Sequence, residues 1–267
     1  MVFIPHHWEI PRLNAYLTTK LEDSELQSLK RSFELGTCAP FNTRLELVIK
    51  HAPEGYIGKP FSYVRRKETE AGRSGPFVVI DEWSAKQGAV WYIENFATEE
   101  EVEDGEAEST NVVWRIPLKI ECLSIAFVNY DIANMSIQED LDALGVEFPV
   151  SEDYTVEEAS DSGGWNVDDD RRSQDAYAVA LPGEFEESTD MELRKKWLPM
   201  PEKVIRLKPG LAEEVGLVNA WSLDQRGLAE QLKKRGIIDF PEGSTGIQLR
   251  YNPEFDWPKY EWPEDSL

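Results

Sequence analysis

Apolar and polar positions alternate through the first half of the chain, and this alternation predicts a β-sheet. In residues 43–50, Leu45, Leu47 and Ile49 alternate with charged residues, as expected for a strand with one buried face. Four further segments are rich in β-branched and aromatic residues and are separated by Gly or Pro: residues 61–65, 77–82, 89–96 and 112–120. We therefore expect five strands in an antiparallel sheet, with the short connection 84–88 forming a hairpin.

Helical spacing first appears after residue 23. Leu26, Leu29 and Phe33 share one helical face, and Gly36 is expected to end this helix. A second helix is predicted over residues 137–144, after a capping box formed by Ser136 and Glu139.

The second half of the chain has fewer regular patterns. Residues 176–181, 203–207 and 247–251 are predicted strands. Ser222 and Gln225 fit a capping box, which predicts a third helix from residue 222 to Gly236.

These elements predict an α+β fold with a mainly antiparallel sheet, about three helices and two acidic loop insertions. We expect an α+β domain over residues 1–150, an acidic flexible loop over 151–175 and a smaller α+β portion over 176–267. The last portion either packs on the first as one domain or stands apart.

The charge is concentrated in two segments. The net charge is -23, from 51 acidic and 28 basic residues. Residues 97–110 hold seven acids and no base, and residues 150–192 hold fourteen acids and two bases. The rest of the chain is close to neutral, so the charge is expected to act through these two segments.

Composition also limits the compartment and the partners. No apolar stretch approaches the roughly 18 residues of a membrane helix, and the N-terminus lacks a secretory pattern, so we expect a soluble cytoplasmic protein with no membrane partner. Cys38 and Cys122 have apolar neighbours and are expected to be buried thiols. The negative field disfavours nucleic acid and favours a basic protein as partner.

Residues 75–148 resemble a known protein family. The features are the strand that begins at Phe77, the hairpin ending in Trp91, the strand around Arg115, and Ala133-Asn134-Met135 before an acidic helix. This stretch resembles a domain-of-unknown-function family of bacterial and fungal proteins. The resemblance implies an α+β body and carries no activity.

The sequence contains no motif for nucleophilic catalysis or phosphate binding. His6 and His7 are adjacent and point to opposite faces of an extended segment, so no metal site is expected there. Asp168, Asp169 and Asp170 lack the alternating ligands of a calcium loop and are expected to be solvated. We predict no metal and no cofactor.

One catalytic hypothesis remains, which is glycoside hydrolysis by paired carboxylates. Glu82 and Glu94 lie on the two arms of the predicted hairpin, close to tryptophans. A glycosidase needs two carboxyl groups about 5 to 10 Å apart. A hydrolase using Glu82 and Glu94 is therefore the alternative to a binding protein.

The C-terminal tail carries Trp257, Tyr260 and Trp262, with a proline after each tryptophan. Proline favours an extended conformation in the residue before it, so the rings either cap the protein's own apolar surface or anchor a partner. Our main hypothesis is a protein that acts by binding a basic partner through its acidic segments, Asp168–Asp170 included, and through this tail. An acidic surface that imitates nucleic acid is a further possibility.

Overall fold

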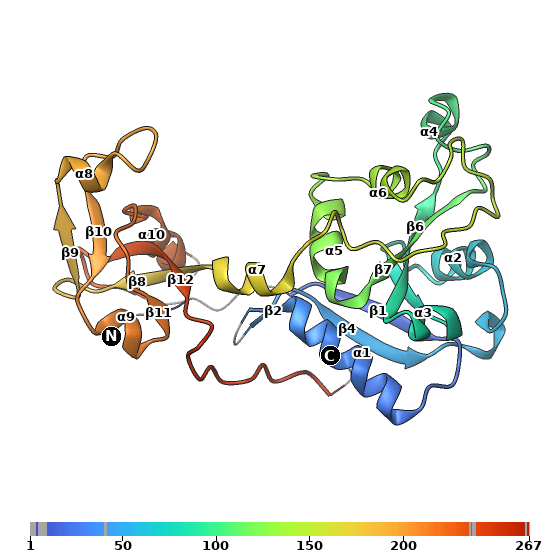
Figure 1. Cartoon of the computed structure of the whole chain (residues 1–267), viewed down its shortest axis with the longest axis horizontal. Helices are drawn as coiled ribbons and strands as arrows, with labels where there is room; N and C mark the ends of the chain where they lie inside the picture. Colours follow the sequence, from blue (N-terminus) through green and yellow to red (C-terminus); the bar gives the residue numbers. More distant parts are fainter. Residues whose placement is uncertain are drawn as a thin grey trace. The chain divides into compact units, whose positions relative to one another are not determined.

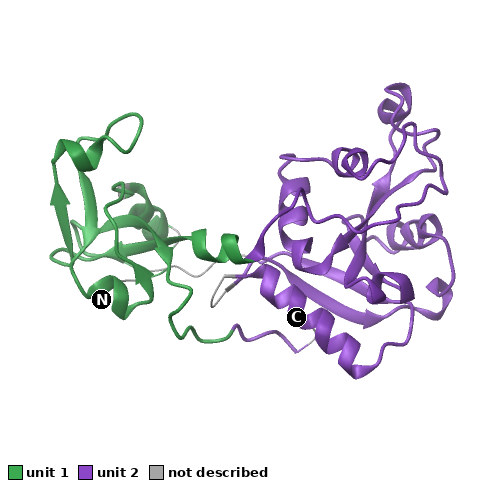
Figure 2. Cartoon of the chain, in the orientation of Figure 1, with its two compact units in different colours: residues 1–8, 39–42, 168–259 green, residues 9–38, 43–167, 260–267 purple. Residues whose placement is uncertain are grey.

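The computed structural model describes residues 4, 10–39, 42–234, 236, 239–264 and 266 of the 267-residue chain. The chain divides into two compact units (Figure 2). Unit 1 comprises residues 1–8, 39–42 and 168–259, and unit 2 comprises residues 9–38, 43–167 and 260–267. Each unit contains apolar clusters of its own.

Unit 2 is built on a five-stranded sheet with the order β4-β1-β5-β6-β7 (Figure 1). The strands are β1 (Arg12–Leu17), β4 (Glu46–His51), β5 (Phe77–Ile80), β6 (Ala89–Phe96) and β7 (Val113–Lys119). Ala15 of β1 lies opposite Ile49 on one side and Val78 on the other, and both pairings are parallel. β5, β6 and β7 pair antiparallel, so the sheet has a parallel half and an antiparallel half.

Helices cover both faces of the parallel half. α1 (Asp23–Thr37) connects β1 to β4 and buries Leu29 and Phe33 against one face. α2 (Phe61–Glu70) connects β4 to β5, after the 3₁₀ turn η1 (Glu54–Tyr56), and buries Val64 against the other face. Right-handed crossovers that run in opposite directions from a central strand place their helices on opposite faces. This half is a doubly wound α/β arrangement.

The antiparallel half carries shorter helices. They are α3 (Glu82–Lys86), α4 (Glu99–Glu103), the 3₁₀ turn η2 (Ile120–Cys122), α5 (Leu123–Asp131) and α6 (Ile137–Ala143). The predicted start of α6 is confirmed, because the Ser136 hydroxyl accepts a hydrogen bond from the Glu139 amide at 3.1 Å and the Glu139 carboxylate accepts one from the Ser136 amide at 2.7 Å. The hairpin of β5 and β6 is also confirmed, with α3 in its connection.

The prediction of a mainly antiparallel α+β fold with about three helices is wrong. The described part of the chain forms ten α-helices, six of them with seven or more residues, and its largest sheet contains parallel pairs. The alternation in residues 43–50 misled because it says nothing about the direction of the neighbouring strand, and β4 pairs parallel with β1. The burial of β4 falls along the strand, from Glu46 and Leu47, which are buried, to Lys50 and His51, which are exposed.

Two elements of the parallel half differ from the sequence prediction. Residues 61–65 form the first turns of α2 instead of a strand. Alternating aromatic residues favour a strand locally, but Val64, Arg65 and Glu68 recur at helical spacing and are buried. β1 was not predicted, although its burial pattern shows Leu13, Ala15 and Leu17 buried on one face.

Gly36 does not end the first helix. α1 continues through Gly36 to Thr37, and the glycine is buried. A Cβ at this position would lie 1.8 Å from the carbonyl oxygen of Glu121. The residue is therefore required for the close approach of α1 to η2, and not for a turn.

Unit 1 contains a three-stranded antiparallel sheet, β11-β12-β8, and a two-stranded sheet, β10-β9. Its elements are β8 (Asp175–Ala180), β9 (Phe185–Ser188), α8 (Met191–Arg194), β10 (Val204–Leu207), α9 (Leu211–Glu214), β11 (Leu217–Val218), α10 (Arg226–Lys234) and β12 (Thr245–Tyr251). The strands predicted at 176–181, 203–207 and 247–251 are confirmed by β8, β10 and β12. The short strands β2 (Cys38–Ala39) and β3 (Asn42–Thr43) pair with each other.

The third helix begins later than predicted. Ser222 and Asp224 form isolated β-bridges with Ile205 and Ile247, and α10 starts at Arg226. The Asp224 carboxylate accepts a hydrogen bond from the Thr245 hydroxyl at 2.5 Å. Pairing with β10 and β12 thus keeps this segment extended, in spite of its capping-box pattern.

Both acidic segments contain helices where the sequence predicted loops. In residues 97–110, α4 begins with a capping box between Thr98 and Glu101, and Ala107 is buried. In residues 151–175, Tyr154 is buried and α7 (Val167–Ser173) begins with three aspartates. The two acidic segments therefore contain regular helices, α4 and α7, in place of the loops that we expected.

None of the helices that the structure describes is long and apolar enough to cross a lipid bilayer. The histidines His6 and His7 lie outside the described residues. Cys122 is a buried, free thiol, and its predicted burial is confirmed, whereas Cys38 is half-buried and its predicted burial is wrong.

Candidate functional site

A cavity of about 290 Å³ lies at the carboxyl ends of the parallel strands of unit 2. Its lining includes Thr18 and Thr19, which follow β1, and Asp81, which follows β5. The chain leaves β1 toward β4 and later returns past β1 to β5, so the sheet order reverses here. Open α/β sheets bind ligands at such a topological switch point. We call this space the switch-point cavity.

Hydrogen bonds fix the strand ends beside this cavity. The Thr18 amide donates to the carbonyl of Ile80 at 3.0 Å, and this bond continues the pairing of β1 with β5. The Asp81 carboxylate accepts from the Ser84 amide at 2.7 Å and caps α3. Lys59, which is exposed and lies two residues before α2, also lines the cavity. The cavity thus presents hydroxyl, carboxylate and ammonium groups on a defined frame.

A buried carboxylate supports one wall of the switch-point cavity. Tyr56 lines the cavity and donates its hydroxyl to Glu68 at 2.6 Å. Glu68 is 1% exposed and also accepts from the Tyr16 hydroxyl at 2.9 Å and from Arg73 at 2.6 and 2.7 Å. Burial acts to raise the pKa of Glu68, but the hydrogen bonds from Arg73, Tyr56 and Tyr16 outweigh it, so this pKa is lowered. The network holds α2 to β1 and to the loop before β5.

A second cavity, of about 430 Å³, adjoins α2 and shares Phe61 with the first. Three rings contact one another along it: the Trp91 ring lies 5.2 Å from Phe61 and 5.3 Å from Trp83, both in tilted geometry. The remaining lining includes Arg115 and Tyr154. We call this space the aromatic pocket. Its rings offer a continuous apolar surface to a flat ligand.

Arg115 is the unusual residue of the aromatic pocket. It lies in β7 opposite Ile93, its exposure is 9%, and its guanidinium lies 4.0 Å from the Tyr154 ring centre. It donates to the carbonyls of Glu152, at 3.3 Å, and Tyr154. Burial lowers the pKa of Arg115. Among the described residues no carboxylate forms an ion pair with this buried cation.

The amino end of α2 faces the same pocket. Pro60, Phe61 and Ser62 line the aromatic pocket, and the helix has no side-chain cap at this end. The first amides of a helix have no partners inside the helix and carry partial positive charge. Arg115 and the start of α2 thus give the pocket two positive features beside its aromatic surface.

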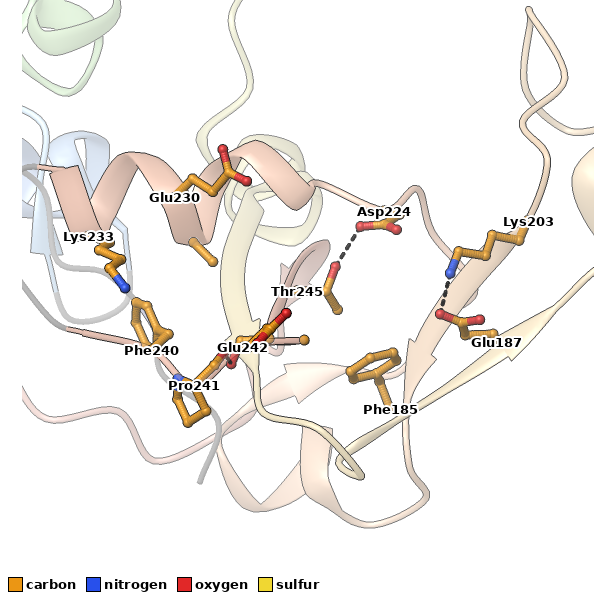
Figure 3. Close-up of a pocket in the computed structure, with 13 residues that line it drawn as sticks. Phe185, Glu187, Lys203, Asp224, Glu230, Lys233, Phe240, Pro241, Glu242 and Thr245 are labelled. Atoms are coloured by element: carbon orange, nitrogen blue, oxygen red, sulfur yellow. Dashed lines mark hydrogen bonds and ion pairs between the residues drawn. The ribbon is translucent and has the colours of Figure 1, made fainter.

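Unit 1 has a cavity of its own, of about 640 Å³, beside α10 (Figure 3). Figure 3 shows Lys203 pointing to Glu187, and Thr245 pointing to Asp224, each pair joined by an interaction. Lys233 lies 2.7 Å from Asp239. Both lysines of this cavity are therefore already neutralised by acids, in contrast to Arg115 in unit 2.

The structure does not bring the two carboxylates of the hydrolase hypothesis together. Val79 pairs with Trp91, so Glu82 follows toward the connection while Glu94 lies toward the opposite end of the hairpin. Glu82 is the first residue of α3, beyond the end of β5, and Glu94 lies in the second half of β6. Glu82 is exposed and lies 2.7 Å from Lys86. Burial, and then repulsion by Glu101, raises the pKa of Glu94, and Glu82 lies at the other end of the hairpin.

The aromatic residues of the tail contact their own units. In unit 1, the ring of Trp257 makes an edge-to-face contact with Tyr251, with 5.5 Å between the ring centres, and its Nε1 hydrogen is donated to the carbonyl of Asn252 at 2.9 Å. In unit 2, the Tyr260 hydroxyl donates to Glu46 at 2.7 Å, and the Trp262 ring lies 6.0 Å from Phe33. These contacts agree with the expectation that the tail caps apolar surface, while partner binding by these rings stays a prediction.

The aspartates proposed for partner binding form the first turn of α7. Asp169 lies 3.9 Å from Arg172, and Asp170 accepts a hydrogen bond from Gln174 at 3.1 Å. No group of three or more His, Cys, Asp or Glu residues that could hold a metal occurs in the described ranges. Asp168, Asp169 and Asp170 thus lie together on one helix, and their role in binding stays a prediction.

Sequence reasoning did not select the residues that line the two cavities of unit 2. A signal for Arg115 was present, because it is a lone charge inside the apolar run from Val112 to Leu118. Such a residue in a buried strand needs compensation, which makes it a candidate functional group. Thr18, Thr19 and Asp81 gave no comparable signal, since their meeting depends on the pairing of β1 with β5.

Comparison with protein-family models, with curated proteins and with solved structures finds no match for this chain. The family resemblance of residues 75–148 therefore stays a prediction.

Proposed function

We propose that this chain is a binding protein, and that unit 2 binds a small ligand at the carboxyl ends of its parallel strands. The observation that carries the proposal is the position of the switch-point cavity, between the ends of β1 and β5, where the order of the strands reverses. The aromatic pocket beyond Phe61 extends the same region. Together the two spaces combine an apolar surface with a few polar groups, as small-molecule sites do.

The proposal is tested by nuclear magnetic resonance with a library of small fragments and the full ¹⁵N-labelled chain. We expect the fragments that bind to shift the amide signals of Thr18, Thr19 and Asp81, which line the cavity. Thr19→Trp fills part of the space and is expected to weaken this binding about tenfold, which corresponds to about 1.4 kcal/mol.

The matched control introduces a tryptophan side chain at a position outside the cavities. Ile132 is 64% exposed in unit 2, and Ile132→Trp should leave fragment binding unchanged. If all fragments shift signals only in unit 1 or at scattered surface positions, the proposal is wrong.

A second candidate function is supported by the charges of residues 97–110. None of the seven acids in this segment forms an ion pair with any residue that the structure describes. Burial raises the pKa of Glu106, and the neighbouring charges of Glu101 and Asp104 add to this effect. Crowded, unneutralised acids on a capped helix support the binding of a basic protein, as proposed from the sequence. Binding that weakens with salt is the expected signature.

A cytoplasmic location belongs to the same proposal. Its support is that Cys122 is a free thiol, as is usual for proteins kept in a reducing compartment. Fractionation of cells that express the full chain would test it, and recovery outside the cytoplasmic fraction would contradict it.

A further inference from the structure

We infer that the aromatic pocket binds a planar aromatic monocarboxylate, with its ring against Trp83 and Trp91 and its carboxylate on Arg115. This inference rests on the proposed function and adds the chemical class of the ligand.

The positive charge of Arg115 is only partly compensated. The Asp153 carboxylate at the rim attracts the guanidinium from a distance, and the Tyr154 ring lies 4.0 Å from it, but no carboxylate among the described residues forms an ion pair with it. A buried charge without a contacting counter-charge costs several kcal/mol. Two backbone carbonyls, of Glu152 and Tyr154, accept hydrogen bonds from the guanidinium. A guanidinium has five N–H donors, and these two carbonyls take only one hydrogen bond each from its two terminal nitrogens. Donors therefore remain for a ligand, and a carboxylate matches their geometry.

The start of α2 adds to this preference for an anion. Pro60, Phe61 and Ser62 line the pocket together with Arg115, and α2 begins without a side-chain cap. Amides at the start of a helix of ten residues favour a negative group. Two independent features of the pocket thus select the same charge.

The other side of the pocket selects a flat apolar group. Trp83, Trp91 and Phe61 form consecutive ring contacts at 5.3 and 5.2 Å. The Trp91 Nε1 atom is buried and has no hydrogen-bond partner in the described chain. A planar aromatic ring gains both burial and favourable ring geometry on such a surface. A pocket of about 430 Å³ is large enough for one or two fused rings.

The rim limits the charge of the ligand to one. Glu152 and Asp153 also line the pocket and are exposed. The Ser109 hydroxyl donates to Glu152 at 3.2 Å, and the Ser151 hydroxyl donates to Asp153 at 2.9 Å. These two carboxylates repel any anion at the mouth, and they repel a doubly charged phosphate ester more strongly than a monocarboxylate, which favours the monocarboxylate of the two.

Three probes separate the contributions of ring and charge. They are 1-naphthoate, its neutral amide 1-naphthamide, and cyclohexanecarboxylate, which has the charge without the aromatic ring. Dissociation constants are measured by nuclear magnetic resonance titration of the full chain. We expect 1-naphthoate to bind at least about tenfold more tightly than either of the other probes, and to shift the indole signals of Trp83 and Trp91.

Two variants locate the site. Arg115→Gln should weaken 1-naphthoate about tenfold or more and leave 1-naphthamide unchanged. Trp83→Ala removes a half-buried ring and should weaken the binding of both aromatic probes by the same factor. This second variant tests the site even if Arg115→Gln does not fold. Arg206→Gln is the matched control, because Arg206 lies 4.5 Å from the Trp221 ring in unit 1 and is paired with Glu186.

The outcomes distinguish this inference from the function on which it rests. Equal affinity for 1-naphthoate and 1-naphthamide, or equal loss of both in Arg115→Gln, would overturn the assigned ligand class. If fragments bind at Thr18 and Asp81 while no aromatic probe enters the pocket, the inference fails and the proposed function stands. If nothing binds in either cavity of unit 2, both are wrong.

Discussion

At the scale of single residues, Glu68 shows how a buried charge is made favourable in this fold. Four hydrogen bonds from Tyr16, Tyr56 and Arg73 reach its carboxylate, which is almost fully buried. Arg115 is the opposite case, because backbone carbonyls accept its hydrogen bonds and no acid among the described residues pairs with it. The contrast explains why we assign a structural role to the first residue and a binding role to the second.

We predict that Glu68→Gln lowers the free energy of unfolding by about 3 kcal/mol at pH 7. The substitution removes the negative charge that accepts hydrogen bonds from Arg73 and from two tyrosines. The pKa of Glu68 is lowered in the folded state from 4.5. The stability that it contributes is present above the unfolded pKa and is lost as pH falls through the folded pKa. The difference between wild type and variant should therefore shrink when urea unfolding is repeated below pH 4.5.

Glu70→Gln is the control for this measurement. Glu70 lies on the same helix, is exposed, and forms a surface pair with Lys67 at 2.6 Å. Its replacement should cost less than about 1 kcal/mol. Equal losses for the two variants would contradict the role assigned to the buried network.

At the scale of elements, the packing of α1 on η2 depends on one position without a side chain. Gly36 faces the backbone of Glu121, and the Ser124 hydroxyl donates to the Gly36 carbonyl at 3.0 Å. We predict that Gly36→Ala destabilises the protein by about 3 kcal/mol, because the added methyl group forces the two elements apart.

Gly55→Ala provides the comparison. A Cβ at Gly55 would meet no atom within 4 Å, so this variant should change the urea midpoint little. If Gly36→Ala is as stable as Gly55→Ala, the close approach of α1 and η2 is not a determinant of stability.

The elements also show what local sequence can and cannot predict here. β6, β7 and α6 were predicted because alternation and a capping box are local signals. The parallel pairing of β1 with β4 and β5 depends on contacts far apart in sequence, and no local pattern specifies it. The switch-point cavity follows from that pairing, so neither Thr18 nor Asp81 was selected in advance. Arg115 was accessible to sequence reasoning, as a single charge in an apolar strand.

At the scale of the whole molecule, some acidic side chains form ion pairs with lysines and others do not. Elsewhere in the described chain some exposed acids, namely Glu70, Glu82 and Glu192, have lysine partners three or four residues away, although others such as Glu157 and Glu213 form no ion pair with a described residue. The acids of residues 97–110 have none within the described residues. A field that is not cancelled locally extends into solvent and attracts a basic partner.

This distribution predicts which acids a basic partner uses. The triple variant Glu99→Gln, Glu100→Gln and Glu103→Gln neutralises exposed positions of α4. It should weaken the binding of an oligolysine peptide about tenfold, and wild-type binding should weaken similarly between about 0.05 and 0.5 M salt. Calorimetric titration at the two salt concentrations measures both effects.

The matched control changes the net charge equally at acids that already have partners. It is the triple variant Glu70→Gln, Glu82→Gln and Glu192→Gln. If net charge alone attracts the peptide, the two triple variants lose affinity equally, and α4 has no special role. If unpaired charge attracts it, only the α4 variant loses affinity, because each control substitution also releases a lysine to water and leaves the local field around α4 intact. An asparagine triple variant at Asp168, Asp169 and Asp170 then decides whether α7 contributes as the sequence predicted.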